Sequence, residues 1–248
     1  MDEIVLRLSG VGKKYPNVTA LTDVSLTLSK GRVYALIGED NSGKTTLFRL
    51  LTGLRKKTSG DIAILGMTGK KLTSARRQVG ALVDSPTYYR ELSIPQNLYA
   101  QARTLGRVDK TRINSLRTAM RLTQDVTGNR KISNCPVGLK QCFALISALL
   151  GSPRLLLLDD PFSGLDTEET GRFIALISDE IAQRDMTILM SSRYLSALYD
   201  FSTDFIFLDN GKVLLEISRE ELKSKLPDEP DADALNAFFA QLVKEARA

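Results

Sequence analysis

The chain has 248 residues, of which 43% are apolar and 25% charged, and its formal net charge is +5. This composition is ordinary for a globular domain and excludes a disordered chain, and the charge is too mild for a dedicated nucleic-acid binder. The sequence holds no histidine and two cysteines, which excludes histidine metal sites, Ser–His–Asp triads and a disulfide framework. No apolar run approaches the ~18 residues that cross a bilayer, so we expect a soluble, cytosolic chain.

The first third of the chain is expected to be mainly strand. Apolar residues alternate with period two at residues 4–8 and 24–28, which predicts two half-buried strands with a turn at residues 15–17 between them. Residues 33–37 form a continuous apolar run, typical of a strand buried on both faces. A glycine-containing loop follows, and residues 46–51 predict a helix. Two further strand candidates are residues 62–65 and 79–83.

The remainder changes from helix back to strand. Residues 86–150 show apolar spacing of three to four and predict a mainly helical insert. Buried strands are predicted at residues 155–158 and 187–190, and a hairpin turns at Asn210-Gly211. An amphipathic helix is expected within residues 235–243, packed on the domain. We therefore predict an α/β fold with a parallel-sheet core and an N-terminal antiparallel β portion. The predicted domains are residues 1–216, with the helical part at about 86–150, and a short helical extension at 217–248.

Residues 38–45 carry the clearest chemical motif. They fit G-x-x-x-x-G-K-[ST] and lie between a predicted strand and a predicted helix, the context that a phosphate-binding loop requires. Backbone N–H groups of such a loop form an anion nest, the lysine reaches the phosphates and the hydroxyl binds Mg²⁺. The expected ATP-binding residues of this segment are Gly38, Glu39, Asp40, Asn41, Ser42, Gly43, Lys44, Thr45 and Thr46.

A second motif is the pair Asp159-Asp160, which follows the apolar run Leu155–Leu158. Asp159 has the position of the acid that holds Mg²⁺ in P-loop nucleotidases. Beside the phosphate loop, a merely solvated pair of carboxylates becomes the weaker interpretation. ATP and Mg²⁺ are therefore the predicted cofactors, with Thr45 and Asp159 as metal ligands.

With these motifs in place, nearly the whole chain resembles the ATP-binding subunit of ABC transporters. Tyr15 resembles the aromatic residue that stacks on adenine, and Ser163-Gly164-Leu165-Asp166 resembles the D-loop. Gly138 with Lys140-Gln141 holds the place of the signature motif, which spans residues 135–139. Residues 79–86, with Tyr88-Tyr89, are most similar to the subgroup associated with bacitracin, lantibiotic and other antimicrobial-peptide export or immunity.

The resemblance implies partners as well as a fold. Two such subunits meet head to tail, so that each ATP lies between one phosphate loop and the other subunit's signature. A second ABC subunit, identical or different, and an integral membrane permease are therefore the expected partners, and nucleic acid is not. The chain is expected to be peripheral on the cytoplasmic face of the membrane, with the permease docked near the helical insert and Asp84.

Four positions depart from the family pattern. Asp84 replaces a glutamine that belongs to the nucleotide and metal site, and Asp160 replaces the glutamate that orients the attacking water. Arg193 replaces the switch histidine. In the signature, Pro136-Val137-Gly138 replaces Ser-Gly-Gly, and proline offers neither a hydroxyl nor a backbone N–H. Glu39 and Asp40 are also acidic where neutral residues are usual.

These departures predict a weak ATPase. The carboxylate of Asp160 lies one C–C bond, about 1.5 Å, further back than that of glutamate, and a misplacement of about 1 Å can cost ~100-fold in rate. Arg193 stays charged and cannot shuttle a proton. The first hypothesis is a motor subunit for export of a peptide or antimicrobial, with Asp160, Asp84 and Arg193 at the catalytic positions.

Two alternatives remain at this stage. The chain could bind nucleotide without hydrolysing it and so gate or stabilise a permease, or, less expected, act as a non-transport protein on nucleic acid or ribosomes. A further hypothesis concerns compensation: Asp84 and Arg193 could face one another across the γ-phosphate as a replacement couple.

Overall fold

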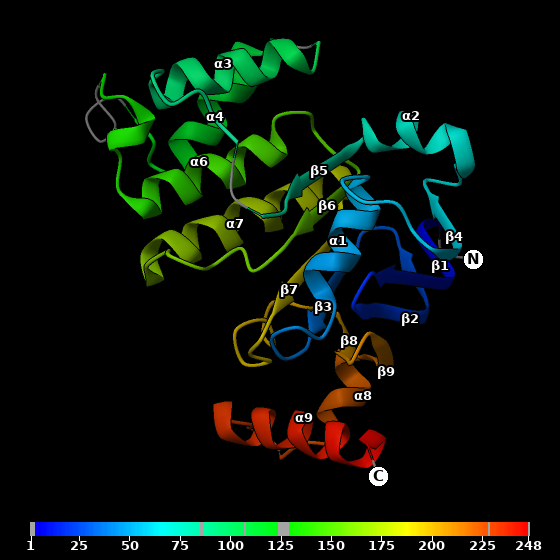
Figure 1. The fold of residues 1–248 in the computed structure, drawn as a ribbon. Coiled ribbons are helices and arrows are strands. Elements are labelled where there is room, and N and C mark those ends of the chain that lie inside the picture. The colour runs from blue at the N-terminus through cyan, green and yellow to red at the C-terminus, as the bar shows by residue number, and fades with distance from the viewer. Residues whose placement is uncertain (1–2, 85–86, 107, 124–128, 228, 248) are drawn as a thin grey trace.

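The computed structural model describes residues 3–84, 87–106, 108–123, 129–227 and 229–247. Within these residues the strands form two sheets, and helices cover the larger one (Figure 1). The larger sheet has, in spatial order, β5 (Val79–Leu82), β6 (Leu155–Leu158), β7 (Thr187–Ser192), β3 (Val33–Ile37), β8 (Asp204–Asp209) and β9 (Lys212–Ser218). The smaller sheet has β2 (Val18–Ser29), β1 (Ile4–Tyr15) and β4 (Ser59–Ile64).

The strand directions confirm the predicted fold class. Neighbours from β5 to β8 are parallel, β9 joins β8 as an antiparallel hairpin partner, and the smaller sheet is antiparallel throughout. The helices are α1 (Lys44–Thr52), α2 (Leu72–Arg76), α3 (Ile94–Thr104), α4 (Lys110–Ala119), α6 (Val137–Leu149), α7 (Thr167–Arg184), α8 (Arg219–Lys223) and α9 (Ala232–Arg247). In the part of the chain that the structure describes, 3₁₀ turns also lie at Gly69–Lys71 and Ile132–Asn134.

Strand β1 is longer than its apolar alternation predicts. It continues to Tyr15, because register shifts between Leu8 and Val11 interrupt the period-two pattern without ending the strand. Gly10 adopts a positive φ of 60° at this irregularity, which glycine tolerates without a Cβ penalty. The expected turn is consequently confined to the residues directly after Tyr15.

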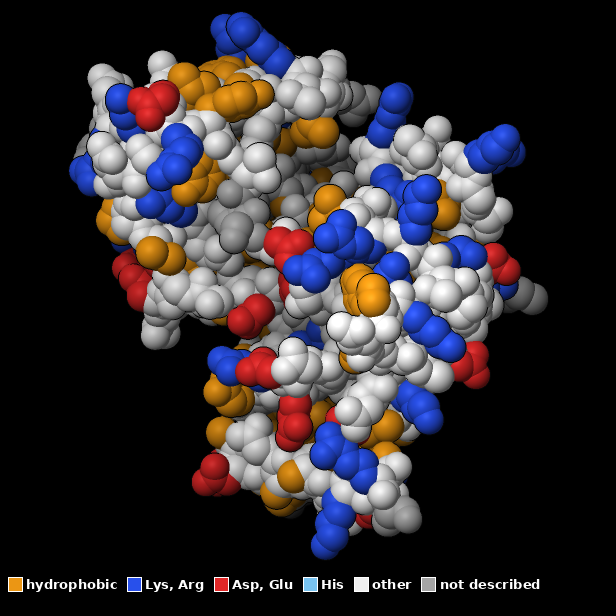
Figure 2. Space-filling view, in the orientation of Figure 1, with side chains coloured by type: hydrophobic (Ala, Val, Ile, Leu, Met, Phe, Trp, Pro, Cys, Tyr) orange, Lys and Arg blue, Asp and Glu red, His pale blue; other side chains and the backbone are white. Residues whose placement is uncertain are grey.

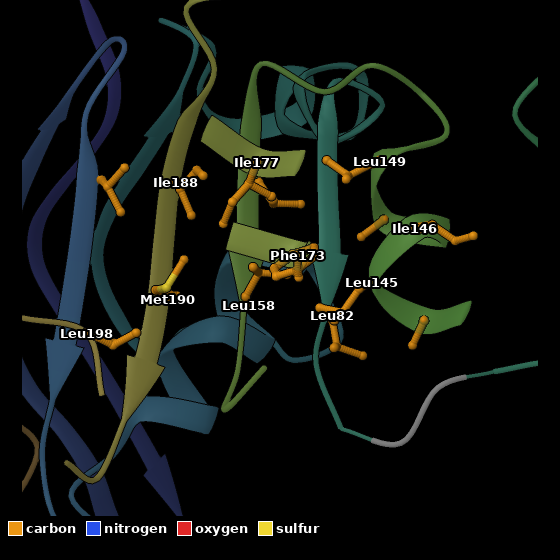
Figure 3. Close-up of a cluster of buried hydrophobic side chains, with 14 of the residues drawn as sticks. Leu82, Leu145, Ile146, Leu149, Leu158, Phe173, Ile177, Ile188, Met190 and Leu198 are labelled. Carbon is orange, nitrogen blue, oxygen red and sulfur yellow. The ribbon is translucent and has the colours of Figure 1, made fainter. Parts of the chain in front are cut away.

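The central strands β6, β7, β3 and β8 of the larger sheet are buried on both faces, which explains their continuous apolar runs. In β3, Val33, Ala35 and Ile37 belong to one core cluster, whereas Tyr34 and Leu36 belong to the other. The first cluster lies under α6 and α7, where Phe173 and Ile177 of α7 pack over Leu158 and its neighbours (Figure 3). The second lies between the sheet, α1 and the smaller sheet.

Among the described helices, none combines the length and the apolar character needed to cross a membrane. On the face shown in Figure 2, basic side chains are spread out and interspersed with acidic and uncharged ones. Helix α9 packs its apolar face on the domain, with Leu235, Phe239 and Val243 buried.

Candidate nucleotide site

The phosphate loop connects β3 to α1. Its backbone turns through the left-handed region at Asn41 (φ 65°) and Gly43 (φ 112°). Gly43 has no room for a side chain, since an added Cβ would lie 2.7 Å from the carbonyl oxygen of Ala20. Helix α1 begins directly at Lys44, so its free N–H groups and positive dipole end open into the loop.

Lys44 lies half-buried inside this loop. Its ammonium donates to the carbonyl oxygens of Gly38 (2.6 Å) and Glu39 (2.7 Å), and lies 3.4 Å from the hydroxyl of Ser42. Burial lowers the pKa of Lys44, while the carboxylates of Asp159, Asp40 and Asp160 act in the opposite direction. The cation is therefore held by acceptors of the loop itself, at the wall of the pocket that the loop lines.

The loop opens into a pocket of 530 Å³. Thr45 and Asp159 both line it, which brings together the two predicted magnesium ligands. The full lining is Asp40, Asn41, Gly43, Lys44, Thr45, Thr46, Asp159, Asp160, Ser191, Ser192 and Arg193. A hydroxyl, a carboxylate and phosphate oxygens are the hard ligands that Mg²⁺ prefers, so these residues fit a Mg–ATP complex.

Ser191, which the sequence analysis missed, binds the carboxylate of Asp159 and the backbone of Asp160. Its hydroxyl donates to Asp159 (2.6 Å) and accepts the backbone N–H of Asp160 (2.9 Å). The parallel pairing of β6 with β7 aligns Leu158 with Met190, so the residues that follow them meet at one sheet edge. Because this register exists only in the folded sheet, no local sequence pattern singles out Ser191.

Asp160 has a strained backbone and a perturbed carboxyl. Its φ is 46°, a left-handed conformation that Asp tolerates better than most residues. Partial desolvation raises the pKa of Asp160, Arg193 lowers it, and Asp159 raises it further. The carboxyl thus holds its proton more readily than a free aspartate does.

Arg193 pairs with the phosphate loop. Its guanidinium lies 3.1 Å from a carboxylate oxygen of Asp40, and this charge raises the pKa of Arg193. The guanidinium also lies 5.3 Å from the ring centroid of Tyr194. The arginine at the switch position therefore neutralises one of the unusual acidic residues of the loop.

The side chain of Asp84 pairs with Arg49, outside the phosphate pocket. Both its carboxylate oxygens accept from Nε of Arg49 on α1, at 3.2 and 3.0 Å, and it does not line the phosphate pocket. The hydrogen bonds from Arg49 lower the pKa of Asp84. The hypothesis of an Asp84–Arg193 couple is wrong in this structure, because each residue has a different partner. Arg49, which the sequence analysis did not single out, is the residue that decides it.

The signature-like segment begins α6 and lies apart from this pocket. Pro136 is the N-cap, and the side chain of the first helical residue, Val137, is 69% exposed. An added Cβ on Gly138 would lie 2.9 Å from the carboxylate of Glu169. Asp166 accepts the backbone N–H of Glu169 (2.7 Å) and caps α7. Signature and D-loop thus form one surface, separate from the phosphate loop of the same chain.

Tyr15 ends β1 and is half-buried. The ammonium of Lys13 lies 4.8 Å from its ring centroid, a cation–π arrangement. The ring is not part of the pocket lining, and its role as an adenine platform stays a prediction.

A phosphate loop, a lysine and a paired carboxylate at the edge of a parallel sheet define a P-loop nucleotide-binding protein. A model of the ABC transporter family matches residues 21–163, more than half of the chain, and the chain belongs to that family.

Similar proteins of known name indicate the subgroup within this family. The lantibiotic transport ATP-binding protein SrtF of Streptococcus pyogenes is 33% identical over 213 residues, covering 86% of this chain and 90% of the relative. The bacitracin transport ATP-binding protein BcrA of Bacillus licheniformis is 29% identical over 222 residues, covering 89% and 72%. These relatives confirm the resemblance to the lantibiotic and bacitracin subgroup.

Solved structures support the fold. An ATP binding subunit of an ABC transporter superposes with a TM-score of 0.85 at 24% identity, covering 96% of this chain and 99% of that one. The ATP-binding cassette MJ0796, in a dimeric post-hydrolysis state bound to ADP and Pi, superposes with a TM-score of 0.79 at 22% identity, covering 86% and 98%.

Proposed function

We propose that the chain is the ATP-binding motor subunit of an exporter for a peptide or antimicrobial. The observation that carries this proposal is the convergence of Lys44, Thr45 and Asp159 on one 530 Å³ pocket, in a chain whose relatives are lantibiotic and bacitracin transport ATP-binding proteins. Thr45 and Asp159 would hold Mg²⁺, which would supply positive charge that neutralises the phosphates.

The chain's own residues supply the binding. Lys44 exchanges its carbonyl partners, Gly38 and Glu39, for phosphate oxygens, and the amides of the loop and of the first turn of α1 donate to the same anion. Thr45 and Asp159 hold the cation, with Ser191 orienting Asp159. Tyr15 stacks on the adenine.

Hydrolysis is proposed to be slow. Asp160 is the residue placed to orient water, but its side chain is one methylene shorter than that of glutamate, so its carboxylate lies further from the attacking water. Arg193 is engaged by Asp40 and carries no transferable proton at neutral pH. In a dimer, Pro136 would offer the partner's γ-phosphate no hydroxyl.

A groove at the border of the helical segment suits the permease. It has a volume of 370 Å³, and its wall includes Tyr89 and Leu105, which are 61% and 51% exposed. Tyr88 is anchored beneath by an edge contact with Phe143, with centroids 6.1 Å apart. Exposed aromatic and aliphatic groups of this kind mark protein interaction sites. We propose that the permease docks here and holds the chain at the cytoplasmic face of the membrane.

The second candidate function is a nucleotide-binding subunit that gates or stabilises the permease essentially without hydrolysis. The observation that favours it is that both substituted residues already form ion pairs within the chain. Arg193 pairs with Asp40, and Asp84 pairs with Arg49. Both candidates share domain bounds of 1–216, with helices within 86–150, and an extension at 217–248.

One experiment separates the candidates. ATP binding and phosphate release are measured on the purified chain, with and without its co-purified membrane partner, beside the Lys44→Ala variant. A motor releases phosphate steadily, above the Lys44→Ala background. Binding without release above that background identifies the gating subunit, and absence of binding rejects both.

A further inference from the structure

We propose that Arg247, the last residue of α9, is a positioning residue for the phosphate loop. It acts through Asp209 and the turn that follows β8, and so makes the last helix a support of the nucleotide pocket. This inference rests on the proposed nucleotide-binding function and adds to it a residue far from the phosphate loop in sequence.

Helix α9 is seated on β8. The rings of Phe207 and Phe239 are stacked with centroids 5.7 Å apart, and Phe238 meets Phe207 edge-on at 5.8 Å. Figure 1 shows α9 lying beside α8 and the β8–β9 hairpin. The helix is therefore fixed to the strand that ends next to the phosphate loop.

Arg247 forms an ion pair with Asp209, the last residue of β8. Its Nε and Nη2 donate to the two carboxylate oxygens at 2.9 and 2.6 Å, and the Asp209 side chain is only 6% exposed. Asn210 donates its side-chain amide to the same carboxylate at 3.0 Å. A buried carboxylate needs a counter-ion, and the bidentate arginine supplies it.

The turn next to Asp209 touches the phosphate loop directly. The backbone N–H of Gly211 donates to the carbonyl oxygen of Ser42 at 2.8 Å. An added Cβ on Gly38 would lie 2.4 Å from the carbonyl oxygen of Leu208. The loop therefore rests against the backbone of this hairpin at two positions, Leu208 and Gly211, and any shift of the hairpin reaches it.

Arg247 also faces the loop itself. Its Nη2 lies 3.9 Å from a carboxylate oxygen of Glu39, one of the two acidic residues that are unusual in this motif. The other, Asp40, is paired with Arg193. Each negative charge of the loop thus has an arginine from a different element, which reduces their repulsion of an incoming phosphate.

Loss of Arg247 would leave Asp209 as a buried carboxylate without a counter-ion, two residues before the Gly211 that binds Ser42. Such a group draws in water or moves toward solvent, because an uncompensated buried charge is costly. Either response displaces the hairpin and loosens the loop. Replacement of both partners by uncharged residues removes that penalty, so the two substitutions are expected to be non-additive.

The test compares Arg247→Ala, Arg247→Lys, Asp209→Asn and the Arg247→Ala/Asp209→Asn double variant. Lys244→Ala is the matched control, since it removes an exposed cation one turn away on the same helix. Hydrogen exchange of phosphate-loop peptides is followed in the absence of nucleotide. Binding of N-methylanthraniloyl-ATP with Mg²⁺ is titrated in parallel, together with the melting temperature.

Arg247→Ala is expected to speed exchange in residues 38–44 and to weaken nucleotide binding about tenfold, a size typical of coupled ion-pair networks. The double variant and Arg247→Lys should recover most of the affinity, and Lys244→Ala should match the parent. A lower melting temperature with unchanged loop exchange and unchanged affinity would overturn the proposal, as would additive effects of the two substitutions.

The two proposals fail differently. A parent chain that does not bind the nucleotide, like Lys44→Ala, rejects the proposed function and with it this inference. A parent chain that binds while Arg247→Ala binds equally well rejects only the role of Arg247.

Discussion

The hydroxyl of Ser191 on β7 lies 2.6 Å from a carboxylate oxygen of Asp159, at the end of the neighbouring strand β6. The same hydroxyl accepts the backbone N–H of Asp160 at 2.9 Å. One small side chain therefore orients the predicted magnesium ligand and fixes the backbone of the predicted catalytic position. Neither carboxylate is placed by its own strand alone.

Removal of this hydroxyl should weaken magnesium binding. For Ser191→Ala we expect the Mg²⁺ concentration that half-saturates ATP binding to rise about tenfold, as is usual when a residue that orients a metal ligand is lost. Titration of Mg²⁺ at a fixed ATP concentration measures this half-saturating concentration. Ser191→Thr keeps a hydroxyl on a residue suited to a strand and serves as the control. Equal Mg²⁺ dependence of all three proteins would contradict the assignment.

Lengthening the side chain at position 160 should increase turnover. Asp160→Glu moves the carboxylate about 1.5 Å toward the pocket, and we expect kcat to rise by up to ~100-fold with little change in ATP affinity. The φ of 46° suits Glu less well than Asp, so a slightly lower melting temperature should accompany the gain. Asp160→Asn is the control and should lower kcat. If Asp160→Glu leaves kcat at or below the parent value, Asp160 is not the limiting defect.

The Asp84–Arg49 pair should make stability depend on acid pH. Arg49 lowers the pKa of Asp84 below its ordinary value of 3.8, so the pair stabilises the folded state above that pH. The contribution disappears as pH falls through the depressed pKa of the folded state. The melting temperature of Asp84→Asn should therefore lie below that of the parent at pH 7, and the difference should shrink below pH 3.8.

Asp179→Asn on α7 is the control for this comparison, because it removes an exposed carboxylate. It should leave the dependence of the melting temperature on pH unchanged. A difference between Asp84→Asn and the parent that persists unaltered at low pH would show that the ion pair does not stabilise the fold.

The buried pair Arg112–Glu180 should hold α4 to α7. The side chains are 10% and 6% exposed, an Nη2–Oε2 bond measures 2.7 Å, and Arg112 also donates to the carbonyl oxygen of Leu149 on α6 at 3.1 Å. Arg112→Ala leaves the buried Glu180 carboxylate with the longer contact to Arg184, at 3.4 Å, as its remaining ion pair, so we expect a loss of up to about 3–5 kcal/mol in the free energy of unfolding. Urea denaturation measures it.

The double variant Arg112→Met/Glu180→Leu removes both charges and keeps the volume filled. It should lose much less stability than Arg112→Ala, because apolar replacement of a buried pair is often neutral. A double variant as unstable as the single one would mean that packing, rather than charge, accounts for the loss.

Local sequence patterns determined the fold class and the core of the site. The continuous apolar run of β3 could be recognised as a doubly buried strand because every residue of it faces one of two cores. The loop ending in Lys44-Thr45 could be recognised because its spacing encodes a strand, an anion nest and a helix start within eight residues. These features depend on neighbours in the chain, so the sequence alone contained them.

Only the tertiary structure decided which charged residues meet. Asp84 binds Arg49, 35 residues away, and Arg247 binds Asp209, 38 residues away. Chemical type and spacing admit many partners for a carboxylate, and the choice is made by which strand and helix ends the fold brings to one edge. Ser191 shows the same limit: a serine is unremarkable in sequence, and the register of β6 against β7 places it on Asp159.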